Sequence, residues 1–285
     1  MMWRRLELIG LLFLILLASC DSPMGVQLVQ EDNGVEVTSL VQGNTSFRLS
    51  PIDTTGVLPS DELAYEGSFI VNIVQHDTGE GGQVESFARV IVSNRQLPIQ
   101  AGGLTFGYHG INLGSVHLNG APMVSRQHTV DVGDSVVAAG TEYAKPTGFA
   151  YKATQTYTWE VDSIDDRGIS IDAPGPLTVE SPVGGSVIST DSDLELRWTC
   201  QNNVTVVISM VGPLGKPKPM LSLTPKKSGS AVVPSKVLQL LPPNHLYVFT
   251  FIQANRKVVK VEDPFFTGDL LVQAASVYSK VVFLR

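Results

Sequence analysis

The chain has 285 residues, of which 43% are hydrophobic and 16% are charged, so it can bury a core and is not typical of disordered proteins. Its 27 acidic side chains outnumber 20 Lys and Arg, and this balance excludes the basic footprint of nucleic-acid binders. The 26 glycines and 17 prolines are typical of many short strands joined by tight turns. The composition therefore favours an all-β protein, and we expect no nucleic acid among its partners.

Residues 1–19 have the pattern of an export signal. Arg4 and Arg5 form a basic head, and an apolar run follows from Leu8 to Ala18. A helix that spans a bilayer needs about 20 apolar residues, so this run is too short for a permanent anchor. It matches the apolar core of a signal peptide. The sequence therefore predicts that residues 1–19 are cleaved off.

The end of this segment, Leu17-Ala18-Ser19-Cys20, resembles the bacterial lipobox. The resemblance implies that Cys20 becomes the new N-terminus, carries a diacylglycerol on its thiol and receives a further acyl chain such as palmitate. Two acyl chains suffice for stable attachment, because each buried methylene contributes about 0.8 kcal/mol. Residues 20–25 would then be a lipidated tether, and the protein would lie on the extracytoplasmic side of a bacterial cell membrane, inner or outer. The alternative is an ordinary secretory signal that ends in cysteine.

Cys20 and Cys200 are the only two cysteines of the chain, so a lipidated Cys20 leaves Cys200 without an intramolecular partner. Cys200 ends a segment in which every second residue from Leu194 is apolar, as in a strand with one buried face. Arg197 would point to the opposite face, where it could not lower the pKa of the thiol. We therefore expect Cys200 to be a buried apolar thiol and not a catalytic nucleophile.

The chain divides best at residues 173–176, where two prolines and a glycine interrupt the strand pattern. In the following unit, residues 177–285, alternating segments at 194–200 and 204–210 predict a β-sandwich. The segment from Leu241 to Phe251 has a leucine, a proline two residues on and a tyrosine six residues on. It resembles the signature of fibronectin type III and related immunoglobulin-like modules.

The resemblance implies two structural core residues. Tyr247 would close a corner, with its ring inside the core and its hydroxyl bonded to the backbone upstream. Trp198 would be the core tryptophan on the second strand of the module. Asn255, eight residues after Tyr247, also matches the pattern. The long segment from Lys257 to Ala275 departs from it and leaves the register of the last strand open.

Residues 26–172 form the N-terminal β-rich domain, which resembles no family that we identify. The strand candidates are 35–37, 69–74, 84–92, 116–118 and 156–161, and a glycine-rich hairpin loop is expected at 77–82. With the unit 177–285, the predicted architecture is two tandem β-sandwich domains after a cleaved signal peptide.

The sequence contains few motifs that are typical of catalytic, metal-binding or phosphate-binding sites. The five histidines show no metal-ligand spacing, although strands could bring His109, His117 and His128 together. The acidic residues Asp162, Asp165, Asp166 and Asp172 surround a glycine without the order of an EF-hand loop. The chain contains no nucleophile elbow and no phosphate-binding loop. We therefore predict no catalytic residue, no metal and no cofactor.

These observations favour a non-catalytic, lipid-anchored protein of the bacterial cell envelope with a binding or scaffolding role for a protein or glycan partner. Two alternatives stay open. The first is an extracytoplasmic glycan or peptide hydrolase with catalytic residues in 26–172, for which paired carboxylates in a cleft would be the sign. The second is a carbohydrate-binding module, which would expose a row of aromatic side chains drawn from Tyr108, Tyr143, Phe149, Tyr151, Tyr157 and Trp159.

Overall fold

The structure is a computed structural model that describes residues 27–32, 35–40, 64–132, 135–164, 169–212, 215, 217–226, 228–262 and 266–285. Cys20, the signal peptide and the tether lie outside these residues. The described chain is almost entirely β-structure, which confirms the predicted all-β class. Its strands are β1 (Gln27–Asp32), β2 (Val35–Ser39), β3 (Gly67–Asp77), β4 (Gly82–Ala101), β5 (Leu104–Gly110), β6 (Val116–Leu118), β7 (Ala121–Pro122), β8 (Val124–Val132), β9 (Ser135–Ala144), β10 (Thr156–Val161), β11 (Ser170–Asp172), β12 (Thr178–Ser181), β13 (Val187–Ile188), β14 (Leu194–Thr199), β15 (Val204–Val211), β16 (Pro217–Pro225), β17 (Ser230–Val233), β18 (His245–Glu262) and β19 (Thr267–Leu284), and a short helix, α3 (Ser235–Leu238), precedes β18.

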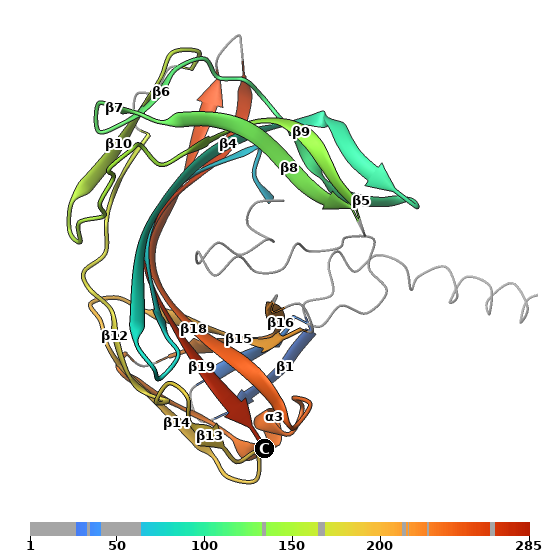
Figure 1. The fold of residues 1–285 in the computed structure, drawn as a ribbon, viewed down its shortest axis with the longest axis vertical. Helices are drawn as coiled ribbons and strands as arrows, with labels where there is room; N and C mark the ends of the chain where they lie inside the picture. The colour runs from blue at the N-terminus through green and yellow to red at the C-terminus, as the bar shows by residue number, and fades with distance from the viewer. Residues whose placement is uncertain are drawn as a thin grey trace, which may run out of the picture.

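One large sheet runs through the whole molecule in the order β1-β2-β16-β15-β18-β19-β3-β4-β5-β9-β8. Its centre is the hairpin β18–β19, whose two strands of 18 residues pair without a break in register from His245↔Leu284 to Glu262↔Thr267. The sheet bends along these long strands into an arc (Figure 1). The hairpin therefore links the two ends of the molecule.

Two small sheets cover the convex side of the arc, which we call the outer face. The sheet β11-β10-β6-β7 packs on one end and the sheet β12-β14-β17 on the other (Figure 1). Between the first small sheet and the large sheet lies a core centred on Trp159 and Phe69, whose rings meet edge to face at 5.8 Å. The second core contains Trp198 and Phe251, with ring centroids 5.9 Å apart. Each core is a two-layer arrangement of sheet on sheet.

The arrangement as two tandem sandwiches is not confirmed, because both predicted units contribute strands to the same large sheet. Strand β3 of the N-terminal unit pairs in parallel with β19, from Gly67↔Leu270 to Asp77↔Lys280. Strand β2 of the N-terminal unit pairs with β16. The architecture is thus two cores that share one continuous sheet, and the domain boundary at 173–176 stays a prediction.

The β3–β4 hairpin, which turns at the predicted loop 77–82, contacts the C-terminal unit at two points. Lys280 Nζ donates to Asp77 Oδ2 over 2.5 Å, and the Lys280 side chain is only 7% exposed. The hydrogen bond and charge of Lys280 lower the pKa of Asp77, so this carboxylate is ionised at neutral pH. A Cβ on Gly79, which has φ +87°, would lie 2.6 Å from the carbonyl oxygen of Gly184. Glycine is therefore required for the hairpin to approach the turn at 184–185.

Candidate functional site

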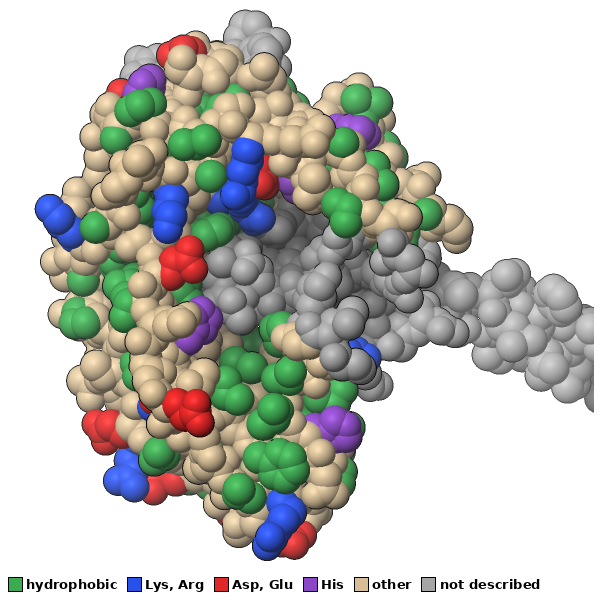
Figure 2. Space-filling view, in the orientation of Figure 1, with side chains coloured by type: hydrophobic (Ala, Val, Ile, Leu, Met, Phe, Trp, Pro, Cys, Tyr) green, Lys and Arg blue, Asp and Glu red, His purple; other side chains and the backbone are tan. Residues whose placement is uncertain are grey.

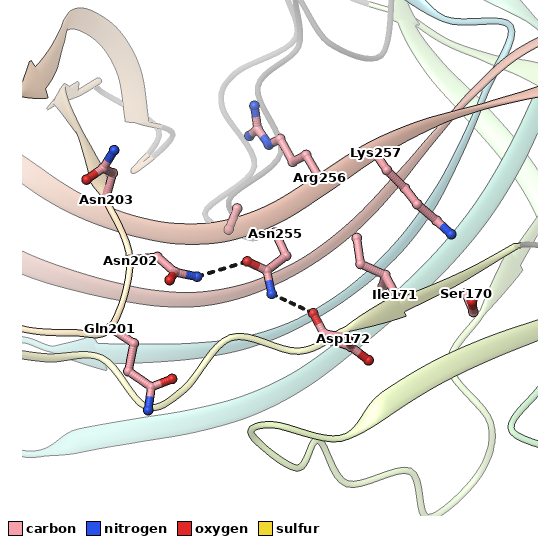
Figure 3. A pocket seen from close by; sticks show the side chains of 10 residues that line it. Ser170, Ile171, Asp172, Gln201, Asn202, Asn203, Asn255, Arg256 and Lys257 are labelled. Atoms are coloured by element: carbon pink, nitrogen blue, oxygen red, sulfur yellow. Dashed lines mark hydrogen bonds between the residues drawn. The ribbon is translucent and has the colours of Figure 1, made fainter.

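A pocket of about 900 Å³ opens at the seam between the two small sheets (Figure 3). The end of β11, the turn between β14 and β15, and the middle of β18 form its walls. The pocket therefore lies where the N-terminal and C-terminal parts of the chain meet. Its lining residues are Ser170, Ile171, Asp172, Gln201, Asn202, Asn203, Ala254, Asn255, Arg256 and Lys257.

Asn255 holds the three walls of this pocket together. Its Nδ2 donates to the backbone oxygen of Asp172 over 2.7 Å, and its Oδ1 accepts from Asn202 Nδ2 over 2.9 Å (Figure 3). These bonds join residues that are 83 and 53 positions apart in the chain. A half-buried amide that is bonded at both ends fixes the seam and gives the pocket a defined shape.

The turn that carries the other carboxamides is fixed by its neighbours. Gly175 is buried against Gln201, since a Cβ at this glycine would lie 2.5 Å from Gln201 Oε1. The Cys200 thiol contacts the backbone oxygen of Asn202 at 2.8 Å. Burial raises the pKa of this thiol, which keeps it protonated at neutral pH. Cys200 is half-buried and not fully buried as the strand pattern predicted, because β14 ends at Thr199 and the chain turns away there.

The pocket offers hydrogen bonds that do not depend on pH. Four carboxamides, from Gln201, Asn202, Asn203 and Asn255, supply both donors and acceptors. The side chains of Gln201, Asn202 and Asn203 are exposed, and Lys257 adds a positive charge at the end of the pocket in Figure 3. Such a lining can bind hydroxyl or peptide groups, which pair with amides as both donor and acceptor. Asp172 is the one carboxylate of the lining, so the lining itself holds no pair of carboxylates.

The two residues predicted for the structural core lie inside the second core. Trp198 is 3% exposed and Tyr247 is fully buried. The Tyr247 hydroxyl donates to the backbone oxygen of Pro242 over 2.8 Å, five residues upstream. Burial raises the pKa of Tyr247 to about 12, so the phenol stays protonated and keeps donating at physiological pH.

The candidate metal ligands are not brought together. His109, His117 and His128 lie on β5, β6 and β8, and the described part of the chain contains no group of three His, Cys, Asp or Glu side chains that could hold a metal. Of the candidate calcium ligands, Asp165 and Asp166 lie outside the described residues. Asp162 instead accepts a hydrogen bond from the backbone nitrogen of Ser115 at 3.3 Å.

The aromatic row that a carbohydrate-binding module would expose is largely internal. Tyr143, Tyr151, Tyr157 and Trp159 are all buried in the first core, at 8% exposure or less. Tyr108 and Phe149 are half-buried. These six side chains therefore do not form an aromatic platform on the surface.

The arrangement nearest to a catalytic pair is the contact between His128 Nδ1 and Glu142 Oε2, at 3.2 Å. A nucleophile beside the second ring nitrogen would complete such a site. Among the described residues, no serine, threonine or cysteine makes a hydrogen bond to that nitrogen.

The sequence alone does not mark the run Gln201-Asn202-Asn203 as part of a site. Three carboxamides in succession at a predicted turn are a weak signal, since turns favour such residues for their backbone conformation alone.

No model of a known protein family matches the chain, and no curated protein is similar to it in sequence. No helix in the described ranges is long and apolar enough to cross a membrane.

Proposed function

We propose that the protein is a lipid-anchored component of the bacterial cell envelope that binds a protein or glycan partner without transforming it. The observation that carries this proposal is the pocket lined by four carboxamides at the seam of the two cores. The carboxamides of Gln201, Asn202 and Asn203 are neutral and exposed, and Asn255 holds Asn202 and the end of β11 in place. Amides are suited to recognition, whereas proton transfer at neutral pH needs groups that titrate near pH 7.

The predicted anchor supports the envelope location. Cys20 lies only a few residues before β1, and the tether 20–25 spans at most about 20 Å when fully extended. A lipid on Cys20 would therefore keep β1 close to the membrane surface. The pocket lies near the middle of the large sheet, several strands away from β1, so a tethered protein can still present it to a partner.

The anchor is tested by labelling cells that express the protein with a fatty acid. We expect Cys20→Ala to abolish incorporation of the label and to leave an unprocessed precursor. Cys200→Ala is the matched control, since it removes the other cysteine and should be labelled and processed normally. Equal labelling of the Cys20→Ala variant and the unaltered protein would contradict the proposed lipid anchor.

Binding is tested with the soluble chain from Ser22 to Arg285 as bait, applied to cell-envelope extract and to isolated peptidoglycan and polysaccharide. We expect saturable binding that is weakened by Gln201→Ala and Asn203→Ala, because both side chains are exposed in the pocket. Gln83→Ala, an exposed carboxamide on β4, is the control and should bind normally. Binding that is unaffected by both pocket variants would remove the pocket from the proposal.

The hydrolase alternative rests on the contact between His128 and Glu142. A screen of the same soluble chain against peptidoglycan, polysaccharide and peptide substrates separates the two functions. Turnover that is lost in Glu142→Gln or His128→Gln would favour the enzyme. Saturable binding without turnover would favour the binding protein.

A further inference from the structure

Apolar side chains form a row across one end of the large sheet on its inner face, which is the face opposite the two small sheets. Residues of β18 and β19 that alternate with those of the second core point to this face, so Leu246 and Phe283 belong to it. These two residues pair in the hairpin, and Val187 of β13 pairs with Phe283. Val187 is 62% exposed and Leu246 is 47% exposed. The row therefore begins with three adjacent apolar side chains, two of which are exposed.

The row continues on the other side of β18. Met210 pairs with Tyr247, so the next residue of β15, Val211, lies beside Leu246. Val211 pairs with Pro217 of β16, and both are half-buried. The row thus crosses five neighbouring strands and consists of Val187, Phe283, Leu246, Val211 and Pro217. Because neighbouring strands are about 4.8 Å apart, the row is about 19 Å long.

The row belongs to an apolar area of the surface. Figure 2 shows hydrophobic side chains gathered in the lower part of the view, around the place where Figure 1 marks the C-terminus. Single exposed apolar residues are normal on a protein surface, whereas contiguous apolar areas mark contact with a protein or a membrane. The position of the predicted anchor distinguishes between these two.

The start of β1 lies near this row. Gln27, the first residue of β1, pairs with Ser39 of β2, and Ser39 pairs with Leu221 of β16. Pro217 is four residues before Leu221 on the same strand. Two strand spacings across and four residues along give about 15 Å between Gln27 and the row. The predicted lipid on Cys20 is seven residues before Gln27, and such a length of chain spans at most about 25 Å. A bilayer that holds this lipid is therefore within reach of the row.

We propose that the row is the surface with which the protein lies on the membrane that holds its anchor. This inference rests on the proposed lipid on Cys20. Five apolar side chains alone bind a bilayer weakly, but a tether that keeps them at the surface raises their effective concentration. The contact then fixes the orientation of the protein. The pocket lies at the seam of the two small sheets on the outer face, so this orientation leaves it open to a partner.

The test places a fluorescent label on the row. The chain from Ser22 to Arg285 with Cys200→Ala contains no other cysteine, so Val187→Cys can be labelled with an environment-sensitive fluorophore. An N-terminal histidine tag holds this chain on phosphatidylcholine vesicles that contain a nickel-chelating lipid. Phosphatidylcholine has no net charge and does not repel a chain of net charge −7. Val136→Cys on β9 is the matched control, since this valine is 67% exposed and lies near the opposite edge of the sheet.

The signal is quenching by brominated acyl chains, which requires contact with the bilayer interior. We expect quenching and a blue shift of the label at position 187, and neither effect at position 136. Equal signals at the two positions would overturn the proposal. A label at position 187 that is already shielded without vesicles, by a second copy or by another part of the chain, would also overturn it, because the row would then be covered.

A second variant tests the row itself. Leu246→Asp should lower the docked fraction of the chain labelled at position 187 about tenfold, because it removes a leucine from the bilayer and places a charge there. Val136→Asp should leave the docked fraction unchanged, and circular dichroism checks that both variants are folded. Unchanged quenching in Leu246→Asp would overturn the proposal. The tag replaces the lipid, so this result does not depend on Cys20, whereas fatty-acid labelling tests the anchor separately.

Discussion

The two small sheets that cover the outer face are built from similar strands, but the N-terminal one is also tied to the large sheet by a tyrosine hydroxyl. The C-terminal cover, β12-β14-β17, lies within positions 178–233, where β13, β15 and β16 of the large sheet interrupt it, and its strands alternate buried and exposed residues. In the N-terminal cover, β6 and β7 come before the β8–β9 hairpin in the chain, and β10 and β11 come after it. This cover is held by a tyrosine hydroxyl: Tyr143 accepts from the backbone nitrogen of Leu113 at 2.7 Å, across 30 residues. The comparison shows that alternation predicts the strands of both covers, whereas the contact of Tyr143 with Leu113 joins residues too far apart for local periodicity to predict.

The inner faces of the two ends differ as well. At the C-terminal end, the buried polar groups are small hydroxyls, and Thr250 and Ser279 pair with each other at 3.3 Å. At the N-terminal end, the same face carries the ionised Glu142 and its arginines. Hydroxyls can satisfy each other locally, whereas buried charges are costly unless a function or a full set of partners retains them. Glu142 has such a set of partners in Arg126, His128 and Arg89.

The largest expected effect comes from removing the central tryptophan of either core. Trp159→Ala and Trp198→Ala should each destabilise the protein by about 3–5 kcal/mol, since both indoles are buried. Because β18 and β19 run through both cores, we expect both variants to lower the midpoint of the same transition. Chemical denaturation, followed by circular dichroism and by fluorescence, measures the free energy of unfolding and the midpoint of the transition for each variant.

Two separate transitions, each affected by one variant only, would show that the two ends unfold independently. A destabilisation below about 0.5 kcal/mol for Trp198→Ala would contradict its place in the core, because surface substitutions have effects of that size.

A second prediction concerns the N-terminal end alone, where β5 crosses β9. Gly140 has φ +87°, and a Cβ there would lie 2.1 Å from the backbone oxygen of Gly110. Gly140→Ala should therefore cost about 2–4 kcal/mol through backbone strain and the forced separation of the strands. Gly148→Ala is the control, since this glycine has φ +73° but open space around it. Thermal unfolding should show a clearly larger loss for Gly140→Ala, and equal losses would mean that the close approach is not present.

A third prediction concerns the ion pair between the adjacent strands β3 and β19, Asp77 to Lys280. The pKa of Asp77 is lowered in the folded protein, so the link stabilises fully above the pKa of the unfolded chain, near 3.8, and is lost as the pH falls through the native value. Asp77→Asn should cost about 1–2 kcal/mol at pH 7, a value reduced for the 24% exposure of Asp77. Unfolding measured from pH 7 down to pH 2 should show the difference between variant and unaltered protein shrinking below about pH 4. Glu195→Gln, in an exposed pair with Arg197, should change little at any pH.

Local alternation was enough to predict many strands but not how the sheet is assembled. The segment 204–210 is a strand, and Val204, Val206 and Ile208 are buried as the pattern indicates. The interpretation of 84–92 as a strand is also confirmed, but β4 continues to Ala101 through an irregular register near Pro98. Because proline usually marks the end of a strand, the sequence does not predict that β4 extends beyond Val92.

The pairing of β3 with β19 could not be predicted, because it joins residues about 200 positions apart and leaves no trace in local periodicity. The same holds for the pocket. Asn255 was part of the fibronectin-like pattern, but only the length of the β18–β19 hairpin places it against Asn202 and Asp172. Likewise, β-alternation can place Glu142 and Arg126 each on one face of its strand, but not opposite each other.

The smallest expected effect, that of Tyr247→Phe, is compared with the loss of the tyrosine hydroxyl that ties the N-terminal cover to the large sheet. Tyr247→Phe removes one hydrogen bond, to the oxygen of Pro242, and should cost about 1 kcal/mol. Tyr143→Phe removes a donor to Asn112 Oδ1 at 3.0 Å and also leaves the buried nitrogen of Leu113 without its acceptor, so it should cost more, about 2–3 kcal/mol. Denaturant unfolding of both variants gives the two values. The order of the two values is the test. If Tyr247→Phe destabilised the protein more than Tyr143→Phe, the local bond from Tyr247 to Pro242 would contribute more than the distant contact of Tyr143 with Leu113. That result would contradict the importance given to the distant contact.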